Sequence, residues 1–169
     1  IYTSGTTGKP KGVLIEHKGL ASLKQYFSMF MGITQNDVVL NFGNPVFGAS
    51  VWEICMALFN GATLCIVTND AMEGDIQGVI DDHQVTIAWF PPAYYVEKPV
   101  GGLRLLITAG PASSKEIVEQ AVPRNQCSLT AYGPSESTTS PTHCHAVAGD
   151  EPPHTIPIGK AIPNTRAYV

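Results

Sequence analysis

The sequence lacks several features by which a class of protein can be recognised. None of its apolar runs approaches the roughly 18 residues of a membrane-spanning helix, and no signal peptide is visible. Its 14 acidic and 10 basic residues give a net charge of −4, and no basic run occurs. We therefore expect no membrane insertion, no secretion and no nucleic-acid partner.

The four cysteines are scattered without C-x-x-C spacing, at Cys55, Cys65, Cys127 and Cys144. The His143-Cys144-His145 cluster could put two imidazoles on one face of a strand, but no third metal ligand is evident. We expect a reduced protein in the cytoplasm.

What the chain does have is a loop rich in small polar residues. Residues 2–12 read YTSGTTGKPKG, with small hydroxyl residues, three glycines and two lysines. Such a loop can aim N–H, hydroxyl and ammonium groups at a polyanion, which is the composition of a phosphate cradle. It is not the P-loop pattern, because only two residues separate Gly5 from Gly8 and Pro10 follows Lys9. A solvated polar loop would have the same composition.

Apolar runs alternate with helical periodicity along the rest of the chain. Strands are predicted at 13–15, 38–42, 62–67, 85–90, 103–108 and 127–132, and an apparent strand at 166–169. Helices are predicted at 17–31, 49–59, from 76 to near 83, and at 113–121, with Ser113 or Ser114 as the cap. This order indicates an α/β fold with a layered, mostly parallel sheet covered by helices. Ligands collect at the carboxyl ends of such strands, where residues 91–92, 109–111 and 132–136 lie.

Five segments together resemble one family. They are residues 2–12, 47–59 (FGASVWEICMALF), 105–112 (LLITAGPA), 131–139 (AYGPSESTT) and 156–169 (IPIGKAIPNTRAYV). In order and spacing they resemble the adenylate-forming (AMP-binding) superfamily, in particular the adenylation domain of nonribosomal peptide synthetases. The resemblance implies that residues 1–169 are a partial adenylation domain, a partial copy of the family's N-terminal subdomain. The C-terminal subdomain and the carrier domain would then lie outside the chain.

The resemblance also implies a reaction and its cofactors. A carboxylic acid would be activated by ATP and Mg²⁺ as an acyl adenylate, then loaded on the phosphopantetheine thiol of a carrier-protein domain. The implied catalytic residues are Thr6, Lys11 and Glu136, with Glu136 holding the metal. Tyr132 would offer a flat face to adenine and Ser135 would contact the α-phosphate. The full implied nucleotide site is Thr3, Ser4, Gly5, Thr6, Thr7, Gly8, Lys9, Lys11, Ala109, Gly110, Pro111, Ala131, Tyr132, Gly133, Pro134 and Ser135.

One position departs from the family. Members that activate amino acids normally read F-D-A where this chain has Phe47-Gly48-Ala49, and the aspartate pairs with the substrate's α-ammonium. Losing one partner of such a pair costs about 2–5 kcal/mol. We therefore expect an acid without an α-ammonium: an aryl, α-keto or α-hydroxy acid. The implied substrate-pocket residues are Gly48, Ala49, Trp52, Trp89, Ile107, Ala109, Ala131, Thr139 and Ser140.

Two alternatives stay open. The first is an acyl- or aryl-CoA ligase of the same superfamily. The second is a catalytically silent binding remnant, for which Gly48 would be a mark of decay. In the family, the ribose-binding aspartate and the C-terminal lysine lie beyond the position of Val169. We therefore expect these 169 residues alone to bind ATP poorly and not to turn over.

Overall fold

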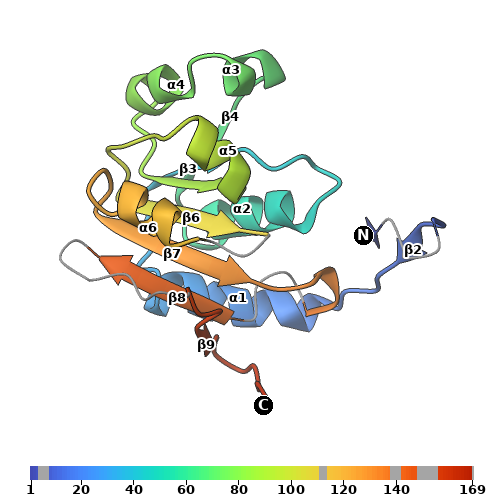
Figure 1. Ribbon diagram of the computed structural model, residues 1–169. Helices are drawn as coiled ribbons and strands as arrows, with labels where there is room; N and C mark the ends of the chain where they lie inside the picture. The colour runs from blue at the N-terminus through green and yellow to red at the C-terminus, as the bar shows by residue number, and fades with distance from the viewer. Residues whose placement is uncertain (4–7, 111–113, 138–141, 148–155, 169) are drawn as a thin grey trace.

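The computed structural model describes residues 1–3, 8–110, 114–137, 142–147 and 156–168. Within these residues, seven strands form one sheet in the order β4-β3-β5-β6-β7-β8-β9 (Figure 1). Five strands are parallel: β4 (Thr63–Ile66), β3 (Val38–Asn41), β5 (Ile87–Phe90), β6 (Leu105–Ala109) and β7 (Cys127–Tyr132). The last two pair antiparallel: β8 (Thr142–Val147) and β9 (Lys160–Ala161). The predicted mostly parallel sheet is confirmed.

Helices cover both faces of the sheet (Figure 1). The buried apolar side chains of α1 (His17–Met29) and α2 (Gly48–Phe59) belong to one cluster. Three short helices contribute buried side chains to a second cluster: α4 (Ile76–Asp82), α5 (Pro92–Glu97) and α6 (Lys115–Ala121). Strand β6 contributes side chains to both clusters: Leu105 and Ile107 belong to the first, and Leu106 belongs to the second. Burial on both faces explains why the strands read as continuous apolar runs.

The N-terminus forms a separate hairpin of β1 (Tyr2–Thr3) and β2 (Lys11–Gly12). The predicted strand at 13–15 is wrong: Val13 donates its N–H to the Ile1 carbonyl at 2.7 Å, and the Leu14 side chain is 97% exposed. Residues 13–15 follow β2 without forming a strand of their own, so the apolar composition of this run did not predict its structure.

Apart from the apparent strand at 166–169, the other predicted elements are confirmed, with ends that differ by at most two residues. Strand β7 has the predicted bounds, whereas α1 ends at Met29 and β5 begins at Ile87. Ser114 is the residue that precedes α6, but its side chain makes no capping hydrogen bond. Residues 166–168 form no strand. The antiparallel β8 and β9 and the short helices α3 (Asn69–Glu73) and α5 are not among the predictions.

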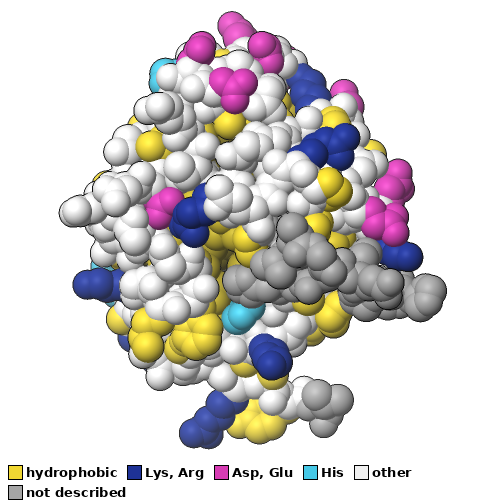
Figure 2. Space-filling view, turned by 90° about the vertical axis from the view of Figure 1, so that its left-hand side faces the viewer, with side chains coloured by type: hydrophobic (Ala, Val, Ile, Leu, Met, Phe, Trp, Pro, Cys, Tyr) yellow, Lys and Arg dark blue, Asp and Glu magenta, His cyan; other side chains and the backbone are white. Residues whose placement is uncertain are grey.

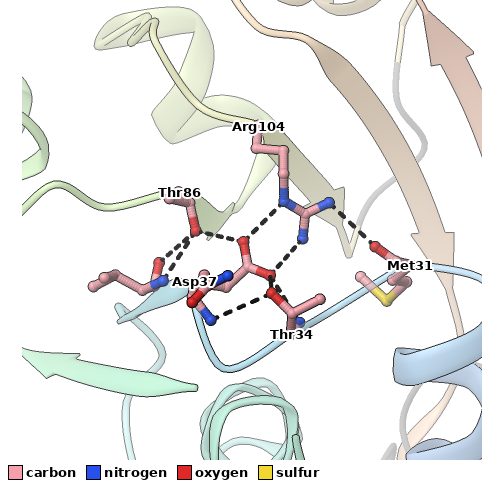
Figure 3. Close-up of polar contacts among 7 residues, drawn as sticks. Met31, Thr34, Asp37, Thr86 and Arg104 are labelled. Carbon is pink, nitrogen blue, oxygen red and sulfur yellow. Dashed lines mark hydrogen bonds and ion pairs between the residues drawn. The ribbon is translucent and has the colours of Figure 1, made fainter. Parts of the chain in front are cut away.

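An ion pair between the buried Asp37 and the partly exposed Arg104 lies at the amino ends of the parallel strands (Figure 3). Asp37 accepts from Arg104 Nε at 2.8 Å and from Arg104 Nη2 at 3.1 Å. It also accepts from the Thr34 N–H at 2.9 Å and from Thr86 Oγ1 at 2.9 Å, and Arg104 donates to the Met31 carbonyl at 3.3 Å. Burial alone would raise the pKa of Asp37, but these hydrogen bonds and the guanidinium charge lower it. The network links α1, β3, β5 and β6 at one edge.

Figure 2 views the molecule from that edge. Asp and Glu side chains gather at the top of this face, where Figure 1 places α3 and α4, and Lys and Arg are scattered over the rest. In the described part of the chain, no helix is both long and apolar enough to cross a bilayer.

Candidate functional site

A cavity of about 250 Å³ opens at the opposite edge, at the carboxyl ends of the parallel strands. Its described lining gathers residues from four places in the sequence: Phe47, Gly48, Ala49, Trp52, Trp89, Ala109, Gly110, Gly133 and Ser135. None of these nine side chains carries a charge. Walls of glycine, alanine and large aromatics leave an apolar chamber with few polar groups, which is typical of a small-molecule site.

The order of the strands explains why these segments meet. From β3 the chain moves outward to β4 and then returns to the other side of β3 with β5, so the winding direction reverses between β3 and β5. Open α/β sheets hold ligands at such a reversal. The connection after β3 supplies Phe47 and Gly48, the end of β5 supplies Trp89, and the end of β6 supplies Ala109 and Gly110.

A second cavity of about 230 Å³ shares Gly48 and Ser135 with the first. Its other lining residues come from the N-terminal segment and the helices: Ile1, Ile15, His17, Leu20, Leu23 and Val51. The strand that carries Thr3 therefore begins beside the corner that carries Ser135. The pairing Thr3↔Lys11 holds together the two ends of the Thr/Gly loop.

Of the Thr/Gly loop itself, the structure describes Thr3, Gly8, Lys9 and Lys11. Gly8 has φ +77°, the left-handed conformation that glycine was expected to supply. Lys9 and Lys11 are exposed. The central residues Ser4, Gly5, Thr6 and Thr7 lie outside the described residues, so their predicted contacts with phosphate stay predictions.

The corner after β7 presents an aromatic face and a carboxylate. Tyr132 ends the strand with 46% of its side chain exposed, and Gly133 and Pro134 follow, also exposed. The Ser137 N–H donates to the Pro134 carbonyl at 3.1 Å and closes a short turn that contains Ser135 and an exposed Glu136. A carboxylate that binds Mg²⁺ with phosphate oxygens fits this exposed position.

Metal ligation by the protein alone is a different matter. Among the described residues, no group of three or more His, Cys, Asp or Glu side chains could hold a metal ion. Among the described residues, Glu136 therefore belongs to no such group, and its predicted role in holding Mg²⁺ stays a prediction.

Two predicted pocket residues lie beneath the cavity. Ile107 is fully buried and Ala131 is 3% exposed, both in the first apolar cluster. They support the floor and are not in its described lining. Pro111, Thr139 and Ser140 lie outside the described residues.

Sequence reasoning did not assign Phe47 to the site. Its side chain lines the cavity although 62% of its surface is exposed. The signal was its place directly before Gly48, at the start of α2, where the helix leaves the rim of the sheet.

The connection between β3 and α2 is held by a buried carboxylate. Glu53, which is 1% exposed, accepts from the Gly43 N–H at 3.0 and 3.1 Å and from Asn41 Nδ2 at 2.7 Å. Burial raises the pKa of Glu53 to about 7, although hydrogen bonds from Gly43, Asn41 and the Phe42 backbone oppose the rise. The sequence reading passed over this group because Glu53 looks like an ordinary helical glutamate.

Comparison with protein families gives one match over the whole chain. The family model described as AMP-binding enzyme matches residues 1–169. Tyrocidine synthase 2 of Brevibacillus parabrevis is 43% identical over 175 aligned residues, and tyrocidine synthase 1 of the same organism is 38% identical over 174. Both matches cover all of this chain, but only 5% and 16% of the synthases.

Solved structures agree with this chain in fold and in part of the sequence. The N-terminal subdomain of Klebsiella oxytoca NpsA in complex with anthranilyl-AMSN has a TM-score of 0.81 and 28% identity. The Vibrio cholerae adenylation domain AlmE in complex with glycyl-adenosine-5′-phosphate has a TM-score of 0.83 and 28% identity. These matches cover 96% and 95% of this chain, and 45% and 32% of those chains. Holo-PA1221, which contains adenylation and PCP domains, has a TM-score of 0.79 and 29% identity, over 95% of this chain and 29% of that one.

Proposed function

Because this chain belongs to the AMP-binding enzyme family, we propose that the protein containing it activates a carboxylic acid as an acyl adenylate in nonribosomal peptide synthesis. A carboxylate oxygen attacks the α-phosphorus of ATP, the bond to the bridging oxygen breaks, and pyrophosphate leaves with that oxygen. A carrier-domain phosphopantetheine thiolate would then attack the acyl carbon and release AMP. The observation that carries the proposal is that three of the five motif segments, together with Trp89, border one uncharged cavity at the strand ends.

The residues of the chain would act mainly by positioning. The exposed ring of Tyr132 can lie against adenine, and Gly110 leaves the backbone accessible beside it. Ser135 borders both cavities, which supports the proposal that it contacts the α-phosphate. Lys9 and Lys11 would neutralise the departing phosphates.

Magnesium fits the residues at this corner. Glu136 would hold it with phosphate oxygens, since one exposed carboxylate and a polyphosphate suit a hard cation that keeps several waters. When bound, the ion would reduce the negative charge that the carboxylate must approach.

The acid class follows from the wall at Gly48. An α-ammonium placed there would enter a chamber whose nine described lining residues include no carboxylate. Burying an unpaired charge is costly, so an uncharged aryl, α-keto or α-hydroxy group suits the chamber better. The broad rings of Trp52 and Trp89 favour a flat acid. The NpsA complex supports an aryl acid, because anthranilyl is an aminobenzoyl group, whereas AlmE shows that related domains also hold glycyl.

The test is ATP–pyrophosphate exchange with a complete adenylation domain that contains this chain. We expect exchange with aryl, α-keto or α-hydroxy acids to exceed exchange with the standard L-amino acids by at least about tenfold. Preference for a standard L-amino acid would contradict the proposed acid class but leave adenylation intact. Exchange with no acid, together with normal Mg·ATP binding that is lost in Glu136→Ala, would favour the silent binding remnant.

The acceptor of the acyl group needs its own experiment. Holo-PA1221 contains an adenylation and a PCP domain, which supports a carrier domain as acceptor here. Incubation of the charged domain with a holo carrier domain or with coenzyme A separates the peptide-synthetase reading from a CoA ligase. We expect transfer to the carrier and little to coenzyme A.

A cytoplasmic location and the low activity of the isolated 169 residues remain predictions.

A further inference from the structure

We infer that Glu53 is a positioning residue for the acid cavity, holding the Phe47–Ala49 wall in place through the connection between β3 and α2. The inference rests on the proposed function, because it concerns the binding of the acid to that wall. Glu53 does not touch the cavity. It acts through the backbone of the segment that does.

The Glu53 carboxylate, on α2, is hydrogen-bonded to Asn41 at the end of β3 and to Gly43 in the connection. Both of its oxygens accept from the Gly43 N–H, at 3.0 and 3.1 Å, and Oε2 also accepts from Asn41 Nδ2 at 2.7 Å. The Asn41 amide reaches Ser50 Oγ at 3.3 Å as well. The end of β3 is therefore tied to the first and second turns of α2, which carry Gly48, Ala49 and Trp52 of the cavity lining.

The rest of the connection is hydrogen-bonded to itself and to the helix. The Phe47 N–H donates to the Asn44 carbonyl at 2.9 Å, and the Val46 N–H donates to Asn44 Oδ1 at 3.1 Å. The Ser50 N–H donates to the Phe47 carbonyl at 3.2 Å. The segment thus has a defined path from its anchor at Gly43 to the exposed ring of Phe47, and a shift at the anchor would displace the wall.

Gly43 shows how closely the connection approaches the helix. A Cβ at Gly43 would lie 2.7 Å from the Ser50 backbone nitrogen and 3.1 Å from its Cα. Only glycine permits this contact without movement of the backbone. The tight approach and the carboxylate together fix the distance between the end of β3 and the start of α2.

Glu53 also fixes how α2 is turned about its axis. Successive helical residues are about 100° apart, so the direction of Glu53 sets that of its neighbour Trp52. Trp52 lines the cavity and packs edge-on against Phe27, with ring centroids 5.4 Å apart. If position 53 served only to fill the core, an apolar side chain would suit it better than a buried carboxylate. The amide donors of Asn41 and Gly43 need an acceptor here, and Glu53 Oε2 accepts from both of them.

The experiment compares Glu53→Ala, Glu53→Gln and Gly43→Ala in a complete adenylation domain containing this chain. Exchange kinetics give KM for the acid and KM for Mg·ATP separately. We expect Glu53→Ala and Gly43→Ala to raise the acid KM about tenfold or more, since small misplacements near a reacting group are costly. Glu53→Gln keeps one acceptor oxygen, so its effect should be smaller. The KM for Mg·ATP should stay within about twofold in all three variants.

The matched control is Glu119→Gln, a surface glutamate on α6 that pairs with Lys115 on the other face of the sheet. It should leave both KM values unchanged. Unchanged acid KM in all three variants would overturn the inference, and so would a parallel rise of both KM values. If Glu53→Ala fails to fold, Glu53→Gln and Gly43→Ala decide between these outcomes.

A second readout does not depend on activity. Amide hydrogen exchange of residues 43–48 should be faster in Glu53→Gln than in the unmodified protein, with α6 unaffected. If the unmodified domain activates no acid, the proposed function fails, and this readout still tests the anchoring. Unchanged protection of residues 43–48 would refute the positioning role even in an active enzyme.

Discussion

Two buried carboxylates stand at opposite edges of the same sheet, and their surroundings differ. Asp37 at the amino edge faces the Arg104 guanidinium, and the pKa of Asp37 is lowered. Glu53 near the carboxyl edge receives amide donors from Asn41 and Gly43, and burial raises its pKa to about 7. A carboxylate paired with a cation favours the folded state, whereas one held by amides alone remains poorly compensated.

This contrast indicates a division of labour between the edges. The amino edge closes three strands and the end of α1 with a satisfied network, and it has no part in the cavity. The carboxyl edge holds a costly buried group beside an open chamber. Functional sites commonly retain such costs because they maintain geometry. The predictions that follow test this division, from the largest expected effect to the smallest.

Removing the carboxylate at the amino edge should mainly reduce stability. Asp37→Ala leaves the Arg104 guanidinium and the donors of Thr34 and Thr86 without their acceptor. We expect a loss of about 3 kcal/mol in the free energy of unfolding, kept moderate because Arg104 is one-third exposed and remains hydrated. Urea unfolding measures this loss. The KM for the acid should not change, and a rise would contradict the division.

Removing the Glu136 carboxylate, at the corner after β7, should reduce activity and leave stability nearly unchanged. Glu136→Ala deletes an exposed side chain, so stability should change little. The exchange rate should fall about 100-fold, or about 2.7 kcal/mol in the activation free energy, because the metal loses its protein ligand. ATP–pyrophosphate exchange at several Mg²⁺ concentrations checks this. A variant with full activity would remove Glu136 from the proposed metal site.

The two buried carboxylates should give opposite dependences of stability on pH. Asp37 stabilises above its unfolded pKa, and that contribution disappears as the pH falls through its lower folded pKa. For Glu53 the folded pKa of about 7 exceeds the ordinary value of 4.5, so its contribution shrinks as the pH rises from 4.5 to 7. Between pH 4.5 and 7, the Glu53 effect should be about 2.5 kcal/mol.

Unfolding of the unmodified domain, Asp37→Asn and Glu53→Gln between pH 4 and 8 separates the two contributions. Glu53→Gln should remove the decline between pH 4.5 and 7, and Asp37→Asn should leave it. A decline that persists in Glu53→Gln would assign it to another group.

A carboxylate at position 48 should change substrate selectivity at the carboxyl edge of the sheet without affecting the amino edge. Gly48→Asp places an anion on the wall shared by the two cavities. We expect selectivity to move toward L-amino acids by about tenfold, or about 1.4 kcal/mol, because the α-ammonium then has a partner. Relative exchange rates with paired amino and keto acids measure the shift. Gly48→Ser is the control of similar size without charge.

Much of the architecture was accessible from local patterns. Strand β7 and helix α2 were predicted almost to the residue, because apolar runs and helical periodicity report burial along one element. The run at 13–15 failed because composition does not reveal whether a partner strand exists, and Leu14 is exposed. The antiparallel strands β8 and β9 were missed because β8 (THCHAV) is not a continuous apolar run and β9 has only two residues.

The sequence alone determined the α/β class, the family resemblance and the glycine at position 48, where the resemblance implies an aspartate. The tertiary structure decided which of those residues share a chamber, that Phe47 lines it, and that Ile107 and Ala131 lie beneath it. It also decided that Glu53 is buried among amides and Asp37 beside a guanidinium. The reason is that burial and charge pairing arise from contacts between distant segments, which a single local pattern does not contain.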